Sequence, residues 1–495
     1  MNEKVISFDE LNEIIYKQKK TLKSCSIEII NVCNFKCSHC YMPCAKKQIM
    51  EFQTFKKIVD QLIDLECLSI LITGGEVFLN PQFKEMYLYA KKKGFIVSIN
   101  TNGSLLNDDL VDLFAKYKPF SIEISLYGYD NESYYNFTGI PNSFNIVNKN
   151  ILKLKQENIN VKLKTVLTKK NYKYLNELKN YCKSIHIPFR YDYIVFPKVD
   201  SKKLKANDER LSIEEFINIL KTDPLAKEHF QKKISCLNCS YSKNVFECIG
   251  GEEGIYITSS GNICMCVVLN NNNYNINNIS IKECISNFKK IKELEYSCNS
   301  KCRYCLKKSL CRYCPARFKL ETNDYNIKAE WYCEMAHQIL HLFDNKITRC
   351  TYKNLKDEEL ELMFDLLKDN YNITSDDKKD IWKNNIINNK KLNTNLIIEN
   401  NILQGYIQFE QKDNDFCICE IQIANKFKGD HKTFRRLIGS FLEDILYDEN
   451  TIIYVNINPN NKKSIEVFSK IGFKNSKNNT YEINVINLLK WYKRS

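Results

Sequence analysis

No apolar run in this 495-residue chain approaches the ~20 residues that a membrane-spanning helix needs. The first twenty residues, MNEKVISFDELNEIIYKQKK, also lack the apolar core and the small-residue cleavage site of a signal peptide. These absences exclude a membrane protein and a secreted one, so we expect a cytoplasmic protein. The length exceeds that of one ordinary core and predicts two or three domains.

A concentrated basic stripe is also missing, although the formal net charge is +14. The lysines are spread along the whole chain beside many asparagines, as in NNNNYNINN from Asn270. A basic patch is what neutralises nucleic-acid phosphates, and scattered lysines do not form one. We therefore expect no nucleic-acid partner, whereas a basic face can still help to attract an acidic peptide.

Cysteine, by contrast, is abundant, with 22 residues. Disulfides are unfavourable in the reducing cytoplasm, so clustered cysteines predict iron or zinc ligands. Cys33, Cys37 and Cys40 have the spacing CxxxCxxC, directly after a predicted strand at 26–31 and directly before Tyr41. Three thiolates on one loop can hold three irons of a four-iron cluster and leave the fourth iron open to a small ligand.

This motif resembles the signature of radical S-adenosylmethionine (radical SAM) enzymes. The resemblance implies that the open iron of the [4Fe-4S] cluster binds the amino and carboxylate groups of SAM. It also implies a low-potential electron donor of the flavodoxin or ferredoxin type, whose electron cleaves SAM to a 5′-deoxyadenosyl radical. His39 lies inside the loop, where we expect its backbone to shape the adenine pocket.

Six β-rich runs alternate with helical stretches in the first half of the chain, at 26–30, 69–75, 95–103, 121–128, 161–167 and 189–195. Their branched and aromatic residues suit buried parallel strands. The alternation predicts an α/β fold, a partial (β/α)6 barrel of the TIM type over residues 25–225, after an extension of residues 1–24. The active groups of such barrels lie at the carboxyl ends of the strands, which is where the polar motifs of this sequence fall.

Three of those strand ends carry candidate SAM-binding residues. After the second run, paired glycines allow close backbone approach, and radical SAM enzymes have a GGE motif here that contacts the methionine amino group. The alternative is an ordinary turn, as it is for the NTNG sequence after the third run, whose side chains can also bond a ribose. The fourth run ends in a serine similar to the one that reaches the SAM carboxylate in the family. The predicted residues are Gly74, Gly75, Glu76, Asn100, Asn102 and Ser125.

A second group of cysteines lies within residues 226–347 and resembles the SPASM extension of peptide-modifying radical SAM enzymes, which binds two auxiliary four-iron clusters. Its members are Cys248, Cys266, Cys302, Cys305, Cys311, Cys314 and Cys333. The resemblance implies one cluster on Cys302, Cys305, Cys311 and Cys333, and a second on Cys248, Cys266 and Cys314 with Cys239 as the fourth ligand. The interval from Cys311 to Cys314 is one residue shorter than is usual in the family, so Cys236 or Cys264 can substitute. Zinc is the competing metal, because paired CxxC units also build zinc sites.

Sulfatase-maturing relatives carry an aspartate after the cysteine that matches Cys266, and the valine at position 267 disfavours a formylglycine-forming activity. We interpret Cys67, Cys182, Cys284, Cys417 and Cys419 as core residues. Cys44 lies near the first cluster loop but is not expected to be a ligand.

Residues 348–495 predict a separate α+β domain with strands at 395–399, 402–409, 416–423 and 452–456. The sequence NPNNKKSIEVFSKIGF resembles the final helix of the GNAT acyltransferase fold, and IANKFKGDHKTFRRLIG resembles its pyrophosphate loop. Gly429 is retained, but His431 replaces a small residue, and Phe468 replaces a tyrosine general acid and cannot transfer a proton. We therefore favour a domain that binds a precursor peptide over an active acyltransferase.

The leading hypothesis is a radical SAM/SPASM enzyme that modifies a ribosomally synthesised precursor peptide by thioether formation, carbon–carbon crosslinking or epimerisation. Only about 24 residues precede the first strand, too few for a separate leader-binding module, which favours the binding role of the last domain. One alternative is a bifunctional enzyme that modifies and acylates a small molecule. The other is a zinc-stabilised binding protein without catalysis.

Overall fold

A computed structural model of the chain describes residues 22–42, 47–198, 206–235, 237, 242–269, 274–344, 347–351, 354–371, 373, 378–399, 402–429 and 431–494. Cys44, Cys236 and Cys239 therefore lie outside the described residues. The chain forms two compact units. The first unit comprises Met1–Phe216, Phe246–Leu294 and Lys319–Asn323, and the second comprises Ile217–Val245, Glu295–Phe318 and Asp324–Ser495.

The first unit is built on a sheet with the strand order β6-β5-β4-β3-β2-β1-β7-β8. Its strands are β1 (Ser24–Ile30), β2 (Ser69–Gly74), β3 (Ile96–Thr101), β4 (Ser121–Ser125), β5 (Val161–Val166), β6 (Phe189–Asp192), β7 (Gly254–Ile257) and β8 (Ile263–Cys264). Strands β1 to β6 are parallel and follow one another in chain order, so all six predicted strands are confirmed. Strand β7 comes from the cysteine-rich region and adds to β1 in parallel, which the sequence did not predict. A parallel α/β sheet is thus established, whereas its closure into a partial barrel stays a prediction.

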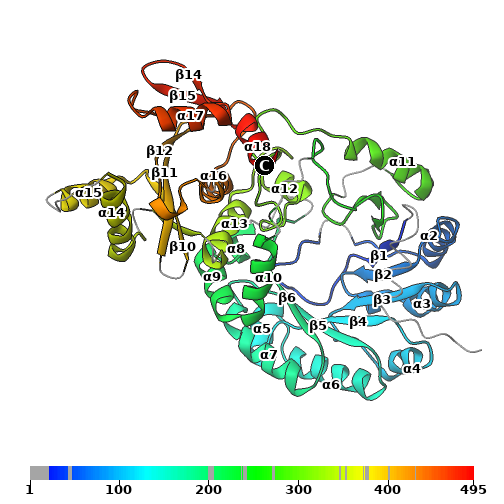
Figure 1. Cartoon of the computed structure of the whole chain (residues 1–495). Helices are drawn as coiled ribbons and strands as arrows, with labels where there is room; N and C mark the ends of the chain where they lie inside the picture. The colour runs from blue at the N-terminus through cyan, green and yellow to red at the C-terminus, as the bar shows by residue number, and fades with distance from the viewer. Residues whose placement is uncertain are drawn as a thin grey trace, which may run out of the picture. The chain divides into compact units, whose positions relative to one another are not determined.

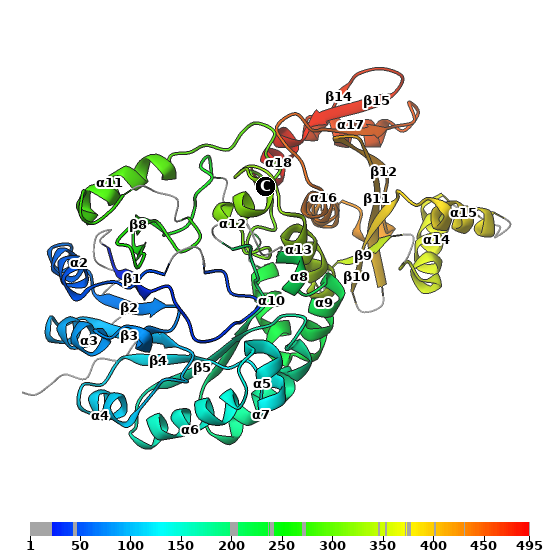
Figure 2. The same ribbon diagram turned by 180° about the vertical axis from the view of Figure 1, so that it is seen from behind.

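Helices connect these strands and cover one side of the sheet (Figures 1 and 2). They are α2 (Phe52–Asp64), α3 (Phe83–Lys92), α4 (Asp108–Lys116), α5 (Asn131–Thr138), α6 (Ser143–Gln156) and α7 (Leu175–Ser184). The first unit also contains α8 (Ala206–Glu209) and α11 (Ile281–Lys292). Helix α2 illustrates why they pack. Its buried residues Phe55, Ile58, Val59 and Leu62 recur at the helical spacing and form one apolar stripe.

The second unit contains a sheet with the order β14-β15-β13-β12-β11-β10-β9. Its strands are β9 (Thr348–Thr351), β10 (Asn393–Glu399), β11 (Ile402–Lys412), β12 (Asp415–Ile423), β13 (Ile452–Asn456), β14 (Lys474–Asn475) and β15 (Thr480–Asn484). The four strands predicted here are confirmed, as β10 to β13. All neighbours pair antiparallel except β12 and β13, which are parallel over only three residue pairs.

Helices pack on both faces of this second sheet (Figure 1). Phe441 of α16 joins Phe409 and Phe416 in one core, while Leu360 of α14 and Tyr406 belong to another. The helices assigned wholly or partly to this unit are α9 (Ile213–Thr222), α10 (Pro224–Ser235), α12 (Pro315–Thr322), α13 (Glu330–Phe343), α14 (Asp357–Tyr371), α15 (Lys379–Asn388), α16 (Lys432–Asp444), α17 (Lys462–Ile471) and α18 (Val485–Arg494). Within the described ranges, no helix is long and apolar enough to cross a membrane.

Candidate functional site

The loop that carries Cys33 leaves the end of β1 and runs directly against the paired glycines at the end of β2. The amide of Gly75 donates to the carbonyl oxygen of Ile30 at 2.7 Å, and the amide of Glu76 donates to that of Val32 at 2.9 Å. A Cβ atom on Gly74 would lie 2.1 Å from the Ile30 oxygen, and one on Gly75 would lie 2.2 Å from the Val32 oxygen. The glycines are therefore required by this close approach, and the two amides hold the cluster loop in place.

Glu76 joins the carboxyl ends of β2 and β3. Its carboxylate is fully buried and accepts hydrogen bonds from the Thr101 hydroxyl and the Asn102 amide, each at 2.7 Å. A weaker bond comes from the Phe78 amide at 3.3 Å. Burial raises the pKa of Glu76 to about 7, although the three hydrogen bonds lower it in part. Glu76 thus has a positioning role that the sequence motif alone did not reveal.

Asn102 connects the end of β3 to the cluster loop. Its side-chain amide donates to Asn34 Oδ1 at 2.8 Å and to the sulfur of Cys33 at 3.6 Å. The same side chain accepts from the Ser104 hydroxyl at 2.7 Å. The NTNG sequence is therefore more than a turn, because its second asparagine orients a predicted cluster ligand.

The three thiols of the CxxxCxxC motif lie close enough together to influence one another. Burial raises the pKa of Cys33 to about 11 and that of Cys37 higher still, and Cys40 adds to both shifts. Cys33 is exposed, whereas Cys37 and Cys40 are partly buried. Convergent, partly exposed thiols on one loop are the donor set that a four-iron cluster requires, so the residues fit this cofactor.

His39, within the cluster loop, packs against two aromatic rings. Its ring lies 5.3 Å from that of Tyr127 and 5.0 Å from that of Phe137, between ring centres. Burial lowers the pKa of His39 to about 4, so the imidazole is neutral at pH 7. Its Nδ1 atom is buried and has no hydrogen-bond partner among the described residues. The ring itself, and not only the backbone that the sequence predicted, shapes this part of the site.

Asn100 and Ser125 lie at the ends of β3 and β4, beside a cation that the sequence analysis missed. Lys164 of β5 pairs in register with Ser125. Its ammonium donates to Asn100 Oδ1 at 2.7 Å and to Glu123 at 3.1 Å. Burial lowers the pKa of Lys164, and Glu123 partly opposes that shift. The only sequence signal for this residue was the alternation of lysine with apolar residues in VKLKTV.

Four cysteines of the second group line a single cavity in the second unit. Cys302, Cys305, Cys311 and Cys333 share this cavity with Lys301, Lys307, Lys308 and Lys328. Burial raises the pKa of each of Cys302, Cys311 and Cys333, and in all three the neighbouring cysteines add to the shift. Four thiolates around a four-iron core carry net negative charge, which the surrounding lysines can offset. The structure thus brings together the four residues predicted for one auxiliary cluster.

The other predicted ligand set is only partly described. Cys248 and Cys266 both flank Gly250 in the first unit, since a Cβ there would lie 3.6 Å from the Cys248 sulfur and 3.9 Å from the Cys266 Cβ. Cys314 belongs to the second unit, and Cys239 lies outside the described residues. The ligand set of this cluster therefore stays a prediction.

The five cysteines predicted to be core residues do not all have that role. Cys67, Cys182, Cys284 and Cys417 are buried. Cys419 is exposed, so the prediction was wrong for this residue. It lies at an irregularity in the pairing of β12 with β11, where the register shifts and a side chain can be turned outward.

Residues 27–182 match the family model of the radical SAM superfamily. The chain therefore contains a radical SAM domain. This domain implies a [4Fe-4S] cluster and SAM as cofactors. The family match ends within α7, so β6, the cysteine-rich region and the sheet of the second unit lie outside it.

Three known proteins similar to this chain differ in what their names say they do. The antilisterial bacteriocin subtilosin biosynthesis protein AlbA of Bacillus subtilis is 33% identical over 149 residues, which span 30% of this chain but only 33% of AlbA. An AdoMet-dependent heme synthase of Methanosarcina barkeri is 23% identical over 334 residues, 62% of this chain and 94% of that protein. Streptococcus suis SuiB bound to its precursor peptide SuiA aligns with a TM-score of 0.51 and 16% identity, over 66% of this chain and 79% of SuiB.

Proposed function

We propose that this protein is a radical SAM/SPASM enzyme that abstracts hydrogen from a ribosomally synthesised peptide and so installs a post-translational modification. The observation that carries the proposal is the convergence of Cys33, Cys37 and Cys40 on a loop fixed by Gly75 and Asn102. When bound there, the cluster supplies the electron that cleaves SAM to a 5′-deoxyadenosyl radical.

The chain's own residues bind and orient SAM in this proposal. The backbone at Gly74 and Gly75 allows close approach, and Glu76 is the expected partner of the methionine amino group. Ser125 and Asn100 reach the carboxylate and the ribose, and Lys164 supplies a positive charge beside both. The wall formed by His39 and its aromatic neighbours provides the apolar surface that an adenine ring requires.

Auxiliary clusters are the second part of the proposal. The cavity lined by Cys302, Cys305, Cys311 and Cys333 supports one of them. Cys248, Cys266, Cys314 and Cys239 are the proposed ligands of the other. Such clusters can take up the electron left after hydrogen abstraction or ligate a substrate thiolate. Zinc, the competing metal, fits less well because the radical SAM domain already requires iron–sulfur assembly in the same chain.

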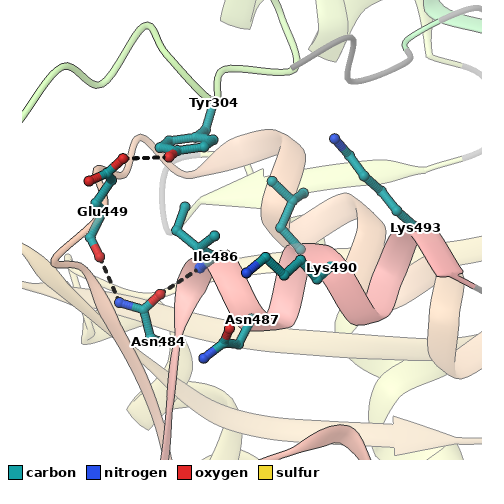
Figure 3. Close-up of a pocket in the computed structure, with 8 residues that line it drawn as sticks. Tyr304, Glu449, Asn484, Ile486, Asn487, Lys490 and Lys493 are labelled. Carbon is teal, nitrogen blue, oxygen red and sulfur yellow. Dashed lines mark hydrogen bonds between the residues drawn. The ribbon is translucent and has the colours of Figure 1, made fainter. Parts of the chain in front are cut away.

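A peptide substrate is favoured by the similarity to AlbA and to peptide-bound SuiB. The second unit also has a cavity of about 510 Å³ that suits an acidic segment of such a peptide. Figure 3 shows Asn487, Lys490 and Lys493 of α18 on one wall and Tyr304 on another. Asn484 closes one end by donating to the backbone oxygen of Glu449 at 2.7 Å. Lysine and asparagine side chains at one opening can pair with carboxylates and peptide groups.

The acyltransferase alternative fits the second unit less well. The GNAT-like assignment is supported by the single parallel pair β12 and β13 within an otherwise antiparallel sheet. Phe468 is buried and packs edge-on against Phe434 and Phe473, so its position holds a core residue with no acidic proton. His431 has a φ of 52°, a left-handed conformation that favours glycine. We infer that this domain binds the precursor peptide and does not transfer an acyl group.

A tetrapyrrole is the second candidate substrate, because the heme synthase relative is matched over 94% of its length. The deciding experiment uses anaerobically reconstituted enzyme, SAM, dithionite and a candidate precursor peptide made with perdeuterated residues. Transfer of deuterium into 5′-deoxyadenosine is expected. No transfer from the peptide, together with consumption of an iron porphyrin under the same conditions, would reject the peptide in favour of the tetrapyrrole.

A further inference from the structure

Three side chains with metal-binding atoms gather on the second sheet, and none of them belongs to the cysteine groups described above. One carboxylate oxygen of Glu410 and the sulfur atoms of Cys417 and Cys419 lie within 4.8 Å of one another. Glu410 stands directly opposite Cys417 in the pairing of β11 with β12. The strands themselves therefore bring the three groups together.

A bulge makes this group accessible. Gln408 pairs with Glu420 and Phe409 pairs with Ile418, so Cys419 is the extra residue on β12. A bulge redirects a side chain, and here it leaves Cys419 exposed while Cys417 remains buried. One ligand thus faces solvent and the others lie deeper, which gives an ion an entry path.

A cation and a tyrosine lie beside these ligands. Lys412 lies 3.6 Å from Glu410, and its ammonium sits 5.6 Å from the ring centre of Tyr454. Tyr454 in turn stands opposite Cys417 on β13. An ion that binds the two sulfur atoms as thiolates displaces their protons.

We propose that Glu410, Cys417 and Cys419 form a zinc site. Zinc accepts thiolate and carboxylate ligands together, with Zn–S bonds of about 2.3 Å and Zn–O bonds of about 2.0–2.2 Å in tetrahedral geometry. Small side-chain movements bring three atoms already within 4.8 Å to those bonds. Water occupies the fourth position on the exposed side. The ion would link β11 to β12. Its binding does not depend on the iron–sulfur clusters of the proposed function.

The test uses the full-length protein, purified and reconstituted with iron and sulfide without air, and then freed of loose metal. Zn²⁺ alone is the probe. Iodoacetamide labelling read by mass spectrometry should show that Zn²⁺ protects Cys419 but not Cys298, an exposed cysteine of the same unit. Equilibrium dialysis should show about one zinc ion per chain lost in Cys419→Ser and weaker zinc binding in Glu410→Gln, with Cys298→Ser unchanged.

Cys419 is exposed, so Cys419→Ser should keep the wild-type melting temperature when zinc is withheld. Equal labelling of Cys419 with and without Zn²⁺ would overturn the site. Undiminished zinc binding by Cys419→Ser would overturn it as well. A disulfide between Cys417 and Cys419 in protein kept free of oxygen would show that the pair is a redox couple and not a ligand set.

Discussion

Glu76 Oε2 accepts a hydrogen bond from the backbone amide of Asn102 at 2.7 Å, and this bond ties the carboxyl end of β2 to that of β3. The side-chain amide of Asn102 in turn donates a hydrogen bond to the sulfur of Cys33. The GGE motif therefore holds the cluster loop in two ways. Gly75 bonds to it directly through its backbone, and Glu76 positions Asn102, which contacts Cys33.

Asn102→Ala should shift the reduction potential of the SAM-binding cluster to a more negative value. The substitution removes an N–H donor to the Cys33 sulfur, and such donors stabilise the reduced, more negative cluster. Each lost hydrogen bond should also cost about 1 kcal/mol of stability. A redox titration followed by electron paramagnetic resonance measures the potential. The control Asn160→Ala removes a side-chain hydrogen bond to the Phe120 carbonyl oxygen elsewhere in the unit and should leave the potential unchanged. Equal potentials in Asn102→Ala and wild type would contradict the role of Asn102.

Gly75→Ala should prevent normal loading of the SAM-binding cluster. Its Cβ would meet the Val32 oxygen at 2.2 Å, so the loop before Cys33 has to move. A local clash of this kind costs about 1–3 kcal/mol or more. Iron content and melting temperature provide the measurement. Gly254→Ala is the matched control, because its Cβ would lie no nearer to another atom than 3.2 Å, the distance to the Ser24 hydroxyl. Normal iron content in Gly75→Ala would show that the close approach is not needed.

Cys311→Ala should remove about four irons per chain while leaving SAM cleavage by the first cluster intact. Cys311 is buried in the cavity shared with three other cysteines. Iron analysis after reconstitution measures this loss. The control is Cys284→Ala, because Cys284 is a buried cysteine of the first unit. If both variants retain the wild-type iron content, Cys311 is not a ligand.

His337→Leu should make the second unit less sensitive to acid. Burial lowers the pKa of His337 to about 2, below the ordinary value of about 6.5. Below pH 6.5 the unfolded chain binds a proton that the folded chain does not, so the free energy of unfolding falls as the pH falls. The loss is at most about 1.4 kcal/mol per pH unit. Urea unfolding at pH 7.5 and 5.5 measures it, and the difference between the two values should shrink in the variant. An unchanged difference would mean that His337 is already protonated in the folded state.

The parallel strands could be predicted because each is a short run of branched and aromatic residues between helical stretches. The predicted cluster ligands of the first loop could be found because their spacing is local. The contact of Asn102 with Cys33 joins residues 69 positions apart, and nothing in either segment marks it. The same holds for Lys164, whose role depends on the register of β5 with β4. Strand β7 was missed because its pairing with β1 joins segments more than two hundred residues apart.

The most direct measurement is 5′-deoxyadenosine formation by the anaerobically reconstituted full-length protein with SAM and dithionite. Wild type should form the product, and Cys182→Ala should do so as well, because Cys182 is a buried residue of α7. Cys37→Ala should form none, since two thiolates cannot hold the cluster with one open iron. Product formation by Cys37→Ala at the wild-type rate, or none by a wild-type protein that has taken up its iron, would contradict the account.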